Sequence, residues 1–299
     1  MIAIDLGSNT IRGIKMNCQK NSFEESFERM VKTADGLSTT GEIAQATVER
    51  IVDALDAMKK EIDFHGESIV AKTTAALRMA SNSEEVIKLI YQRTGVLFEV
   101  IDAKQEAFYT QLAVKSRLEL LNAGNECLLL DVGGGSTEVI VCSDEGVESM
   151  SVDVGIVTMS QSYKDKESLV KSLYSSLEPV KHFMQSIENK PKMLVSTAGT
   201  PTTMASMKQG LTVKSYDPTI VNGTILNDDD LERQLQRLLD MDEEQRALHV
   251  GVGRDSLIVT GVEILRVLMD LLEYDEMIVI DDGLREGLAI DECRKSLKI

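Results

Sequence analysis

Two segments of this chain repeat one pattern, and this repeat constrains the fold more than any other feature. Residues 4–14 read IDLGSNTIRGI and residues 130–140 read LDVGGGSTEVI. Each begins as an apolar strand, passes through Asp, an apolar residue and Gly into a small polar turn, and resumes as a strand; the second turn counts as one residue longer. A third strand follows in each half, over 23–32 and 146–153. Single Asp-x-Gly hairpins are common, but two of them one domain apart indicate a duplicated α/β unit.

Strand and helix patterns alternate through the remainder of both halves. Apolar residues at helical spacing predict the helices. For the helix over 81–95, Asn82 or Ser83 is the expected N-cap and Gly95 the expected end. The predicted helices cover 41–62, 81–95, 103–121, roughly 166–187, 228–239, 256–272 and 284–295. Further strands are predicted within 67–75 and 191–201, each followed by a loop, and over 96–101 and 276–283. The 299 residues are enough for two medium-sized domains.

The charge of the chain excludes some partners. A formal net charge of −17 repels nucleic acid and other polyanions at long range, so we expect no nucleic-acid partner. No basic segment precedes the first apolar run, and no apolar stretch approaches the roughly 20 residues of a membrane span. We therefore expect a cytoplasmic protein with no membrane partner.

The cysteines are few and scattered. Cys18, Cys127, Cys142 and Cys293 form no CxxC pair. In a cytoplasmic protein this spacing predicts reduced thiols. Cys127 and Cys142 stand in apolar runs, which predicts that they belong to the core.

The two glycine turns carry groups that suit phosphate. A turn of Gly, Ser, Asn and Thr directly after a strand aims several backbone N–H groups at one point, and small residues let a phosphate approach closely. The hydroxyl groups of Ser8, Thr10, Ser136 and Thr137 can add donors. Two such turns could therefore grip adjacent phosphates.

An aspartate leads each turn. Asp5 and Asp131 could hold Mg²⁺, directly or through water, and so bridge phosphate oxygens. The alternative is that each is a turn residue whose side chain hydrogen-bonds its own backbone. The pairing of the two hairpins favours the functional interpretation.

Three further features could contact phosphate. Arg12 lies on the strand after the first turn, and Arg78 follows the loop KTTAAL. A guanidinium group presents a planar fork of N–H donors that suits phosphate oxygens. The alternative for both arginines is a surface or interdomain salt bridge. The loop TAGTPTT (197–203) could contact a nucleotide or a further phosphate, and it could equally be a helix N-cap with Pro in the first turn.

Other catalytic patterns are missing from the sequence. It contains no GxxxxGK[ST] loop, no HExxH and no GxSxG, and its three histidines are scattered with none followed by Asp. The remaining candidate for a general base is a carboxylate, and pattern alone does not choose among the 49 acidic residues.

Seven motifs in order resemble one family. They are DLGSNTIR (5–12), TTAALRMA (73–80), IDAKQEA (101–107), LLLDVGGGSTEV (128–139), STAGTPTT (196–203), GRDSLIVTGVEIL (253–265) and DDGLREGL (281–288). Together they resemble the exopolyphosphatase / guanosine pentaphosphate phosphohydrolase (Ppx/GppA) family over essentially the whole chain. The resemblance implies two actin-like α/β domains, of the ribonuclease H-like type, flanking a cleft. It assigns 1–117 plus about 284–299 to the first domain and 118–283 to the second.

The resemblance implies that Glu106 is the catalytic general base, which takes a proton from the water that attacks the terminal phosphorus. The family motif is close to Gly-x-Glu-Glu-Ala, whereas this chain has Ala103 in place of the Gly and Gln105 in place of the first Glu. The C-terminal motif, usually Glu-Arg-x-Asp, begins here with Gly253 and Arg254.

The other site residues implied by the resemblance fall into three sets. The phosphate-binding set is Ser8, Asn9, Arg12, Arg78, Gly133, Gly134, Gly135, Ser136 and Thr137. Asp131 and Glu138 resemble the metal-associated acids, beside Asp5, with Mg²⁺ as the expected cofactor. Gly199, Thr200 and Thr202 are expected to contact a nucleotide or a further phosphate.

The expected activity is release of terminal phosphate from inorganic polyphosphate, from pppGpp, or from both. The negative net charge and the end of the sequence soon after LREGL favour short polyphosphate or the nucleotide as the substrate. Homodimers are common in the family, so a homodimer is expected. Two alternatives remain open: a sensor of guanosine tetra- or pentaphosphate without turnover, and an ATP-dependent kinase or ATPase of the same fold.

Overall fold

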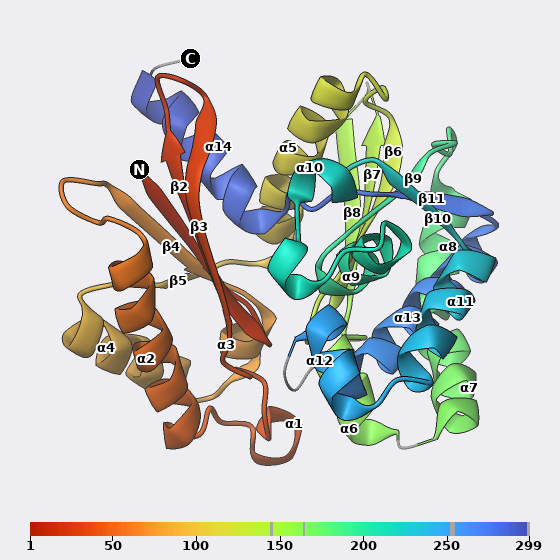
Figure 1. Cartoon of the computed structure of the whole chain (residues 1–299), viewed down its shortest axis with the longest axis horizontal. Helices are drawn as coiled ribbons and strands as arrows, with labels where there is room; N and C mark the ends of the chain where they lie inside the picture. The colour runs from red at the N-terminus through yellow and green to blue at the C-terminus, as the bar shows by residue number, and fades with distance from the viewer. Residues whose placement is uncertain (144–145, 164, 252–254, 298–299) are drawn as a thin grey trace. The chain divides into compact units, whose positions relative to one another are not determined.

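The computed structural model describes residues 1–143, 146–163, 165–251 and 255–297. The chain forms two compact units (Figure 1). Unit 1 comprises Met1–Val114 and Asp282–Ile299, and unit 2 comprises Lys115–Asp281. The boundaries expected from the sequence, after residue 117 and near 284, lie within a few residues of these limits.

Unit 1 is built on a five-stranded sheet in the order β3-β2-β1-β4-β5. The strands are β1 (Ile2–Leu6), β2 (Thr10–Asn17), β3 (Ser22–Met30), β4 (Ile69–Thr73) and β5 (Glu99–Val100). The first three form an antiparallel meander, and β4 and β5 run parallel to β1. The helices are α1 (Leu37–Thr40), α2 (Gln45–Glu61), α3 (Ala75–Met79), α4 (Ser83–Thr94), the first part of α5 (Ala103–Leu121), and α14 (Leu284–Leu297).

Helices α2 and α14 cover opposite faces of this sheet. A Cβ on Gly13 would lie 2.6 Å from the Met58 sulfur of α2, so β2 and α2 pack closely on that face. The neighbouring residue Ile14 points the other way and packs with Leu288 and Ala289 of α14. Because strand residues alternate between faces, one β2 segment supplies both layers of the core.

Unit 2 is built on a six-stranded sheet in the order β10-β11-β9-β6-β7-β8. The strands are β6 (Cys127–Val132), β7 (Thr137–Ser143), β8 (Gly146–Val152), β9 (Leu194–Thr197), β10 (Thr224–Asn227) and β11 (Glu276–Val279). The helices are α6 (Ile156–Ser162), α7 (Lys166–Ser176), α8 (Glu178–Ser186), α9 (Gly199–Lys208), the 3₁₀ helix η1 (Val213–Ser215), α10 (Pro218–Val221), α11 (Asp228–Leu239), α12 (Glu243–Val250) and α13 (Asp255–Leu272).

Helix α13 lies at the centre of the unit 2 core. Val262, Ile264, Leu265 and Leu268 are fully buried in it and pack with the apolar strands and with α9. Although α13 is long and apolar, no helix in the described part of the chain is both long and apolar enough to cross a bilayer.

The two sheets share one strand order. The series β8-β7-β6-β9-β11 of unit 2 repeats β3-β2-β1-β4-β5 of unit 1, and β10 adds an edge strand. Both series consist of an antiparallel meander followed by parallel strands. The α/β fold with a duplicated unit, expected from the repeated hairpins, is confirmed.

The expected difference in turn length appears in the strand bounds: three residues separate β1 from β2, and four separate β6 from β7. The strand pairing is nevertheless equivalent, because Leu6 pairs with Ile11 in the first hairpin and Val132 pairs with Thr137 in the second. Four residues therefore lie between the innermost paired residues in both hairpins. Each turn is closed by the same backbone bond, from Gly7 N–H to the Thr10 carbonyl and from Gly133 N–H to the Ser136 carbonyl, both 2.9 Å.

Several secondary-structure predictions need correction. The helices expected over roughly 166–187 are α7 and α8, which are separated at Leu177, and Pro179 lies in the first turn of α8. The strand expected over 96–101 is only two residues long. Helices α6 and α12 and strand β10 were not predicted, whereas α9 corresponds to the alternative interpretation of 197–203 as a helix start with Pro in the first turn. Asn82 precedes α4, but its side chain accepts from Ile43 N–H instead of capping the helix.

The prediction of reduced thiols is wrong for two of the four cysteines. Cys18, after β2, and Cys293, in α14, form a disulfide with their Cα atoms 5.1 Å apart. They are 275 residues apart in sequence, so only the packing of α14 on the sheet reveals the pair. Cys127 and Cys142 are free and fully buried, as predicted.

Candidate active site

The carboxyl ends of parallel strands collect the predicted residues of unit 1 at one edge of its sheet. Leu6 of β1 is in register with Thr73 of β4, and Thr73 is in register with Val100 of β5. The segments that follow these strands are therefore neighbours. They carry, in turn, Ser8 and Asn9, then Arg78, then Glu106. Ligands bind at this kind of edge in α/β sheets.

Glu106 lies in the first turn of α5 and is held by Arg78. The Arg78 Nη1 atom lies 3.1 Å from Glu106 Oε2 and also donates to the Ile101 carbonyl at 2.9 Å. Glu106 is only 8% exposed, so the ion pair is mostly shielded from water. Arg78 can therefore fix the carboxylate in one orientation.

The start of α5 is set by a reciprocal cap. Asp102 Oδ1 accepts from Gln105 N–H at 2.8 Å, and Gln105 Oε1 accepts from Asp102 N–H at 3.1 Å. This is a capping box, which satisfies backbone donors at a helix start. Gln105 thus supplies a neutral acceptor where the family motif has Glu, and the next residue is Glu106. The pattern Asp-x-x-Gln before a helix could have revealed this role from the sequence.

Asp5 and Arg12 stand opposite one another on β1 and β2. Arg12 is also opposite Glu28 on β3, and its Nε lies 3.3 Å from the Glu28 carboxylate. The salt bridge considered as an alternative for Arg12 is therefore present within its own sheet. Ser8 is buried, and Asn9 is half-buried in the same turn.

In unit 2, Asp131 and Glu138 stand opposite one another on β6 and β7. Glu138 is 2% exposed, and its Oε1 atom accepts from the hydroxyl groups of Ser136 at 2.8 Å and Ser151 at 2.9 Å. Thr137 donates its hydroxyl to the Val154 carbonyl. Both predicted hydroxyl donors of this turn are thus directed to acceptors of the protein. Sequence reasoning missed Ser151, although it is the cross-strand partner of Glu138.

The loop after β9 adjoins the second glycine turn, because Thr197 is in register with Asp131. Ala198 has φ +81° and ψ −177°, a conformation that is strained for any residue with a Cβ. Gly199 begins α9. Thr200 is buried against Gly261 of α13, and Thr202 donates its hydroxyl to the Ala198 carbonyl. The two threonine side chains are therefore used in packing and capping α9.

Two further predictions concern the C-terminal motif and a metal site. The altered C-terminal motif at Gly253 and Arg254 lies outside the described residues. Within the described part of the chain, no group of three or more His, Cys, Asp or Glu side chains is arranged to hold a metal ion by itself.

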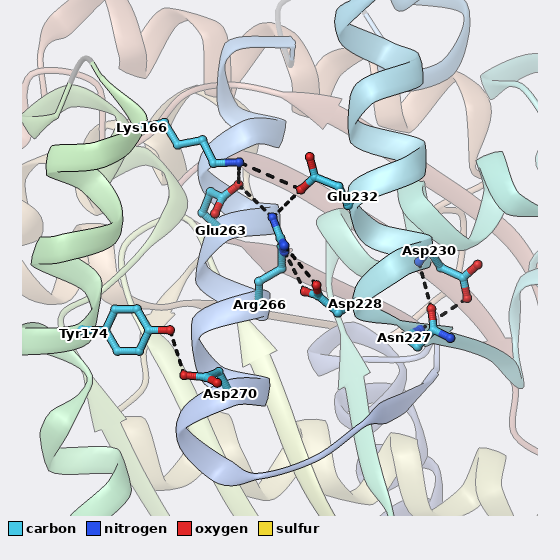
Figure 2. A network of polar contacts seen from close by, with 9 residues as sticks. All are labelled: Lys166, Tyr174, Asn227, Asp228, Asp230, Glu232, Glu263, Arg266 and Asp270. Atoms are coloured by element: carbon cyan, nitrogen blue, oxygen red, sulfur yellow. Dashed lines mark hydrogen bonds and ion pairs between the residues drawn. The ribbon is translucent and has the colours of Figure 1, made fainter.

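A separate charged cluster in unit 2 is structural (Figure 2). Arg266 of α13 binds both carboxylate oxygens of Asp228 and also contacts Glu232, both on α11. Lys166 lies 2.8 Å from Glu263. The hydrogen bonds to Asp228 raise the pKa of Arg266 above its usual range, so this group is a permanent cation. Lys166, Asp228, Glu263 and Arg266 line a cavity of about 710 Å³. The two cations and three carboxylates of the cluster form ion pairs that join α11 to α13.

The comparisons with known proteins identify the family. The Ppx/GppA phosphatase family model matches residues 24–296. The chain belongs to the Ppx/GppA phosphatase family. The match covers most of unit 1 and all of unit 2, including Arg78, Glu106 and the second glycine turn, whereas the first glycine turn precedes the matched residues.

Named relatives of two kinds are similar to this chain. It is 26% identical to Exopolyphosphatase 2 of Mycobacterium tuberculosis, with 96% of this chain and 97% of that protein covered. It is 27% identical to guanosine-5'-triphosphate,3'-diphosphate pyrophosphatase of Vibrio vulnificus, with 97% of this chain covered. The chain spans 58% of the Vibrio protein. Other curated relatives are also longer, and the chain spans about half of them.

A solved structure supports the same family. The crystal structure of the Aquifex aeolicus Ppx/GppA family member has a TM-score of 0.75 with 29% identity, and the match covers 99% of this chain and 97% of that one. The correspondence extends over both units and therefore includes the two glycine turns.

Proposed function

We propose that this chain hydrolyses the terminal phosphoanhydride bond of inorganic polyphosphate or pppGpp and releases phosphate. Family membership supports the phosphatase class, and the names of the mycobacterial and Vibrio relatives support the two substrates. Both substrates end in the same kind of bond, so one set of residues can serve either. The observation that carries the proposal is the buried Glu106 carboxylate, held by Arg78 at the carboxyl edge of the unit 1 sheet.

Glu106 is the general base in this proposal. The orientation of its carboxylate is set by the capped first turn of α5 and by the contact with Arg78. A water oxygen bonds to the terminal phosphorus, its proton passes to Glu106, and the bond between phosphorus and the bridging oxygen breaks. A positioned base of this kind contributes about 10²–10⁴-fold to a rate.

Arg78 has two roles in the proposal. Its Nη1 atom holds Glu106 and the Ile101 carbonyl, which fixes the guanidinium plane. The remaining N–H groups of the fork can bind oxygens of the phosphate under attack. Ser8, Asn9 and Arg12 of unit 1 and Gly133–Thr137 of unit 2 supply further phosphate contacts, chiefly through backbone N–H groups in the second turn.

The oxygen donors present fit Mg²⁺ bound together with substrate. Magnesium usually takes one or two carboxylates and completes its shell with water and substrate phosphates. Asp5 in unit 1, and Asp131 with Glu138 in unit 2, offer such carboxylates, and Glu138 is oriented by two serine hydroxyls. When bound, the ion would neutralise phosphate charge.

The net charge bears on substrate length. A field from −17 formal charges opposes the approach of a long polyanion, and this repulsion grows with substrate charge. Short polyphosphate and pppGpp are therefore the preferred substrates in this proposal.

Phosphate release from tripolyphosphate, long polyphosphate and pppGpp, measured with Mg²⁺, tests the proposal. Glu106→Gln should lower kcat by about 10²–10⁴-fold. Glu119→Gln is the matched control, because Glu119 is exposed on the same helix; it should leave kcat within about twofold. If Glu106→Gln releases phosphate as fast as the parent, Glu106 is not the general base. A parent that binds pppGpp without releasing phosphate would favour a sensor.

A further inference from the structure

Gly155 lies against the backbone of the second glycine turn. A Cβ at this position would be 2.4 Å from the Gly134 carbonyl oxygen and 2.4 Å from the Gly135 carbonyl carbon. The Gly155 backbone has φ −125° and ψ 160°, an extended conformation that any residue adopts. Glycine is therefore required here by the close approach of two backbones and not by the local conformation.

The residues beside Gly155 hold the turn by hydrogen bonds. Ile156 N–H donates to the Gly133 carbonyl at 2.9 Å, and Val157 N–H donates to the Gly134 carbonyl at 2.8 Å. The first N–H groups of α6 are thus used within the protein. On the other side of Gly155, the Val154 carbonyl accepts from the Thr137 hydroxyl.

These bonds decide which way the turn presents its N–H groups. In a trans peptide the C=O of one residue and the N–H of the next point in opposite directions. Because the carbonyls of Gly133 and Gly134 point toward α6, the N–H groups of Gly134 and Gly135 point away from it. Two adjacent N–H groups with that orientation form a concave anion-binding surface.

Unit 1 contains a related arrangement after its third strand. Val31 and Lys32 N–H groups donate to the Asn9 carbonyl, both at 2.9 Å, and Ala34 N–H donates to the Ser8 carbonyl at 2.8 Å. The bound carbonyls are the second and third of the turn here, and the first and second in unit 2. In both units, the segment that leaves the third strand binds carbonyls of the turn between the first two strands, which argues that these bonds serve the turns.

We propose that residues 154–157 position the second glycine turn for phosphate and that Gly155 is its positioning residue, which acts through Gly134 and Gly135 without touching substrate. This inference rests on the proposed function, since it takes the turn to be a phosphate-binding element of that reaction.

The expected effect of Gly155→Ala follows from the distances. Ordinary van der Waals contact begins near 3.4 Å, so a methyl group 2.4 Å from the Gly134 oxygen forces a displacement of about 1 Å. Displacements of that size in binding groups can lower kcat/KM by about 10²-fold. Because the turn holds phosphate before and during reaction, the larger part of the loss should be a rise in KM.

The experiment measures kcat and KM for tripolyphosphate with Mg²⁺, the tripolyphosphate Kd by calorimetry, and the thermal midpoint. Gly155→Ala should raise KM and Kd at least about tenfold. Gly146→Ala is the matched control, because Gly146, with φ +144°, begins β8, the strand that precedes Gly155. Its methyl group strains the backbone far from the turn, so it should lower the midpoint and leave KM unchanged.

Ile156→Pro provides a second variant should Gly155→Ala fail to fold. Proline suits the first position of a helix. It removes the N–H that bonds Gly133, together with the partly buried Ile156 side chain. The extended conformation of Gly155 is the one a residue before proline prefers. This variant should raise KM several-fold.

The outcomes separate the two proposals. If the parent releases phosphate and both folded variants keep KM and Kd within about twofold, the positioning role is wrong and the proposed function stands. An equal rise in KM for Gly146→Ala would also overturn the positioning role. If the parent binds tripolyphosphate without releasing phosphate, the proposed function fails, and the Kd values still decide the role of Gly155. A parent that neither binds nor hydrolyses overturns both.

Discussion

Reduction of the Cys18–Cys293 disulfide should destabilise unit 1 and leave unit 2 unchanged. The bond joins the β2–β3 turn to α14, whose apolar side packs on β1 and β2. Without the bond, α14 would be held by that packing and by its connection to β11. Both bonded cysteines and the helix belong to unit 1.

The magnitude follows from the length of chain that the bond closes. The cysteines are 275 residues apart, but the residues of unit 2 lie within this loop and can remain folded. The flexible part is then on the order of 100 residues, for which restriction of the unfolded chain corresponds to about 4.7 kcal/mol; native disulfides typically contribute about 2–5 kcal/mol. With a urea m-value of about 2 kcal/mol/M, the urea midpoint of unit 1 should fall by about 1–2.5 M.

The assay is urea unfolding followed by circular dichroism, with and without dithiothreitol, for the parent and for Cys18→Ser. Dithiothreitol should lower the urea midpoint of unit 1 in the parent to the value of Cys18→Ser. It should leave the urea midpoint of Cys18→Ser unchanged. Protein equilibrated with oxidised glutathione and then unfolded in urea should show two free thiols, from Cys127 and Cys142. Four thiols under those conditions, or equal midpoints with and without reductant, would refute the reasoning.

Three further predictions concern stability. Gln105→Ala removes the acceptor for Asp102 N–H and should lower the free energy of unfolding of unit 1 by about 1 kcal/mol, whereas Gln105→Glu should retain it, as denaturant titration would detect. Ala198→Gly relieves the strained φ of +81° and should raise the thermal midpoint by an amount equivalent to about 1 kcal/mol; a lower midpoint would contradict the strain. Hydrogen bonds from Arg266 lower the pKa of Asp228, so this carboxylate stabilises unit 2 above about pH 4, and the stabilisation is lost as pH falls through the folded-state pKa. Asp228→Asn should therefore be less stable than the parent by about 0.5–1 kcal/mol at pH 7, the range for a half-exposed pair, and urea midpoints of the two proteins should converge in acid.

Much of the fold could be predicted because its determinants are local. Helix α11 begins and ends where its pattern predicted, over Asp228–Leu239, since Asn227 caps it and its apolar residues recur at helical spacing. The two glycine hairpins were likewise visible as short contiguous patterns. In contrast, α9 was expected only as one of two interpretations of 197–203, because its sequence, rich in Thr and small residues, has little helical periodicity and is buried on most sides.

The candidate site was predicted in composition but not in its contacts. The residues that carry the motifs were identified, and Glu106 by resemblance alone. The bond from Arg78 to Glu106 joins positions 28 residues apart, and it exists because β4 and β5 are adjacent and parallel. The hydroxyl groups of Ser136 and Thr137 were expected to face phosphate, yet the fold provides them with acceptors on neighbouring segments.

The sequence by itself determined that this chain repeats an α/β unit, where each repeat places its glycine turn, and to which family the chain belongs. These properties depend on short runs of residues whose backbone preferences and spacing are set locally. Only the tertiary structure decided that Cys18 meets Cys293 and that Gly155 must have no side chain. Each of these depends on the approach of two backbones that are distant in sequence, and no local pattern specifies which backbones will meet.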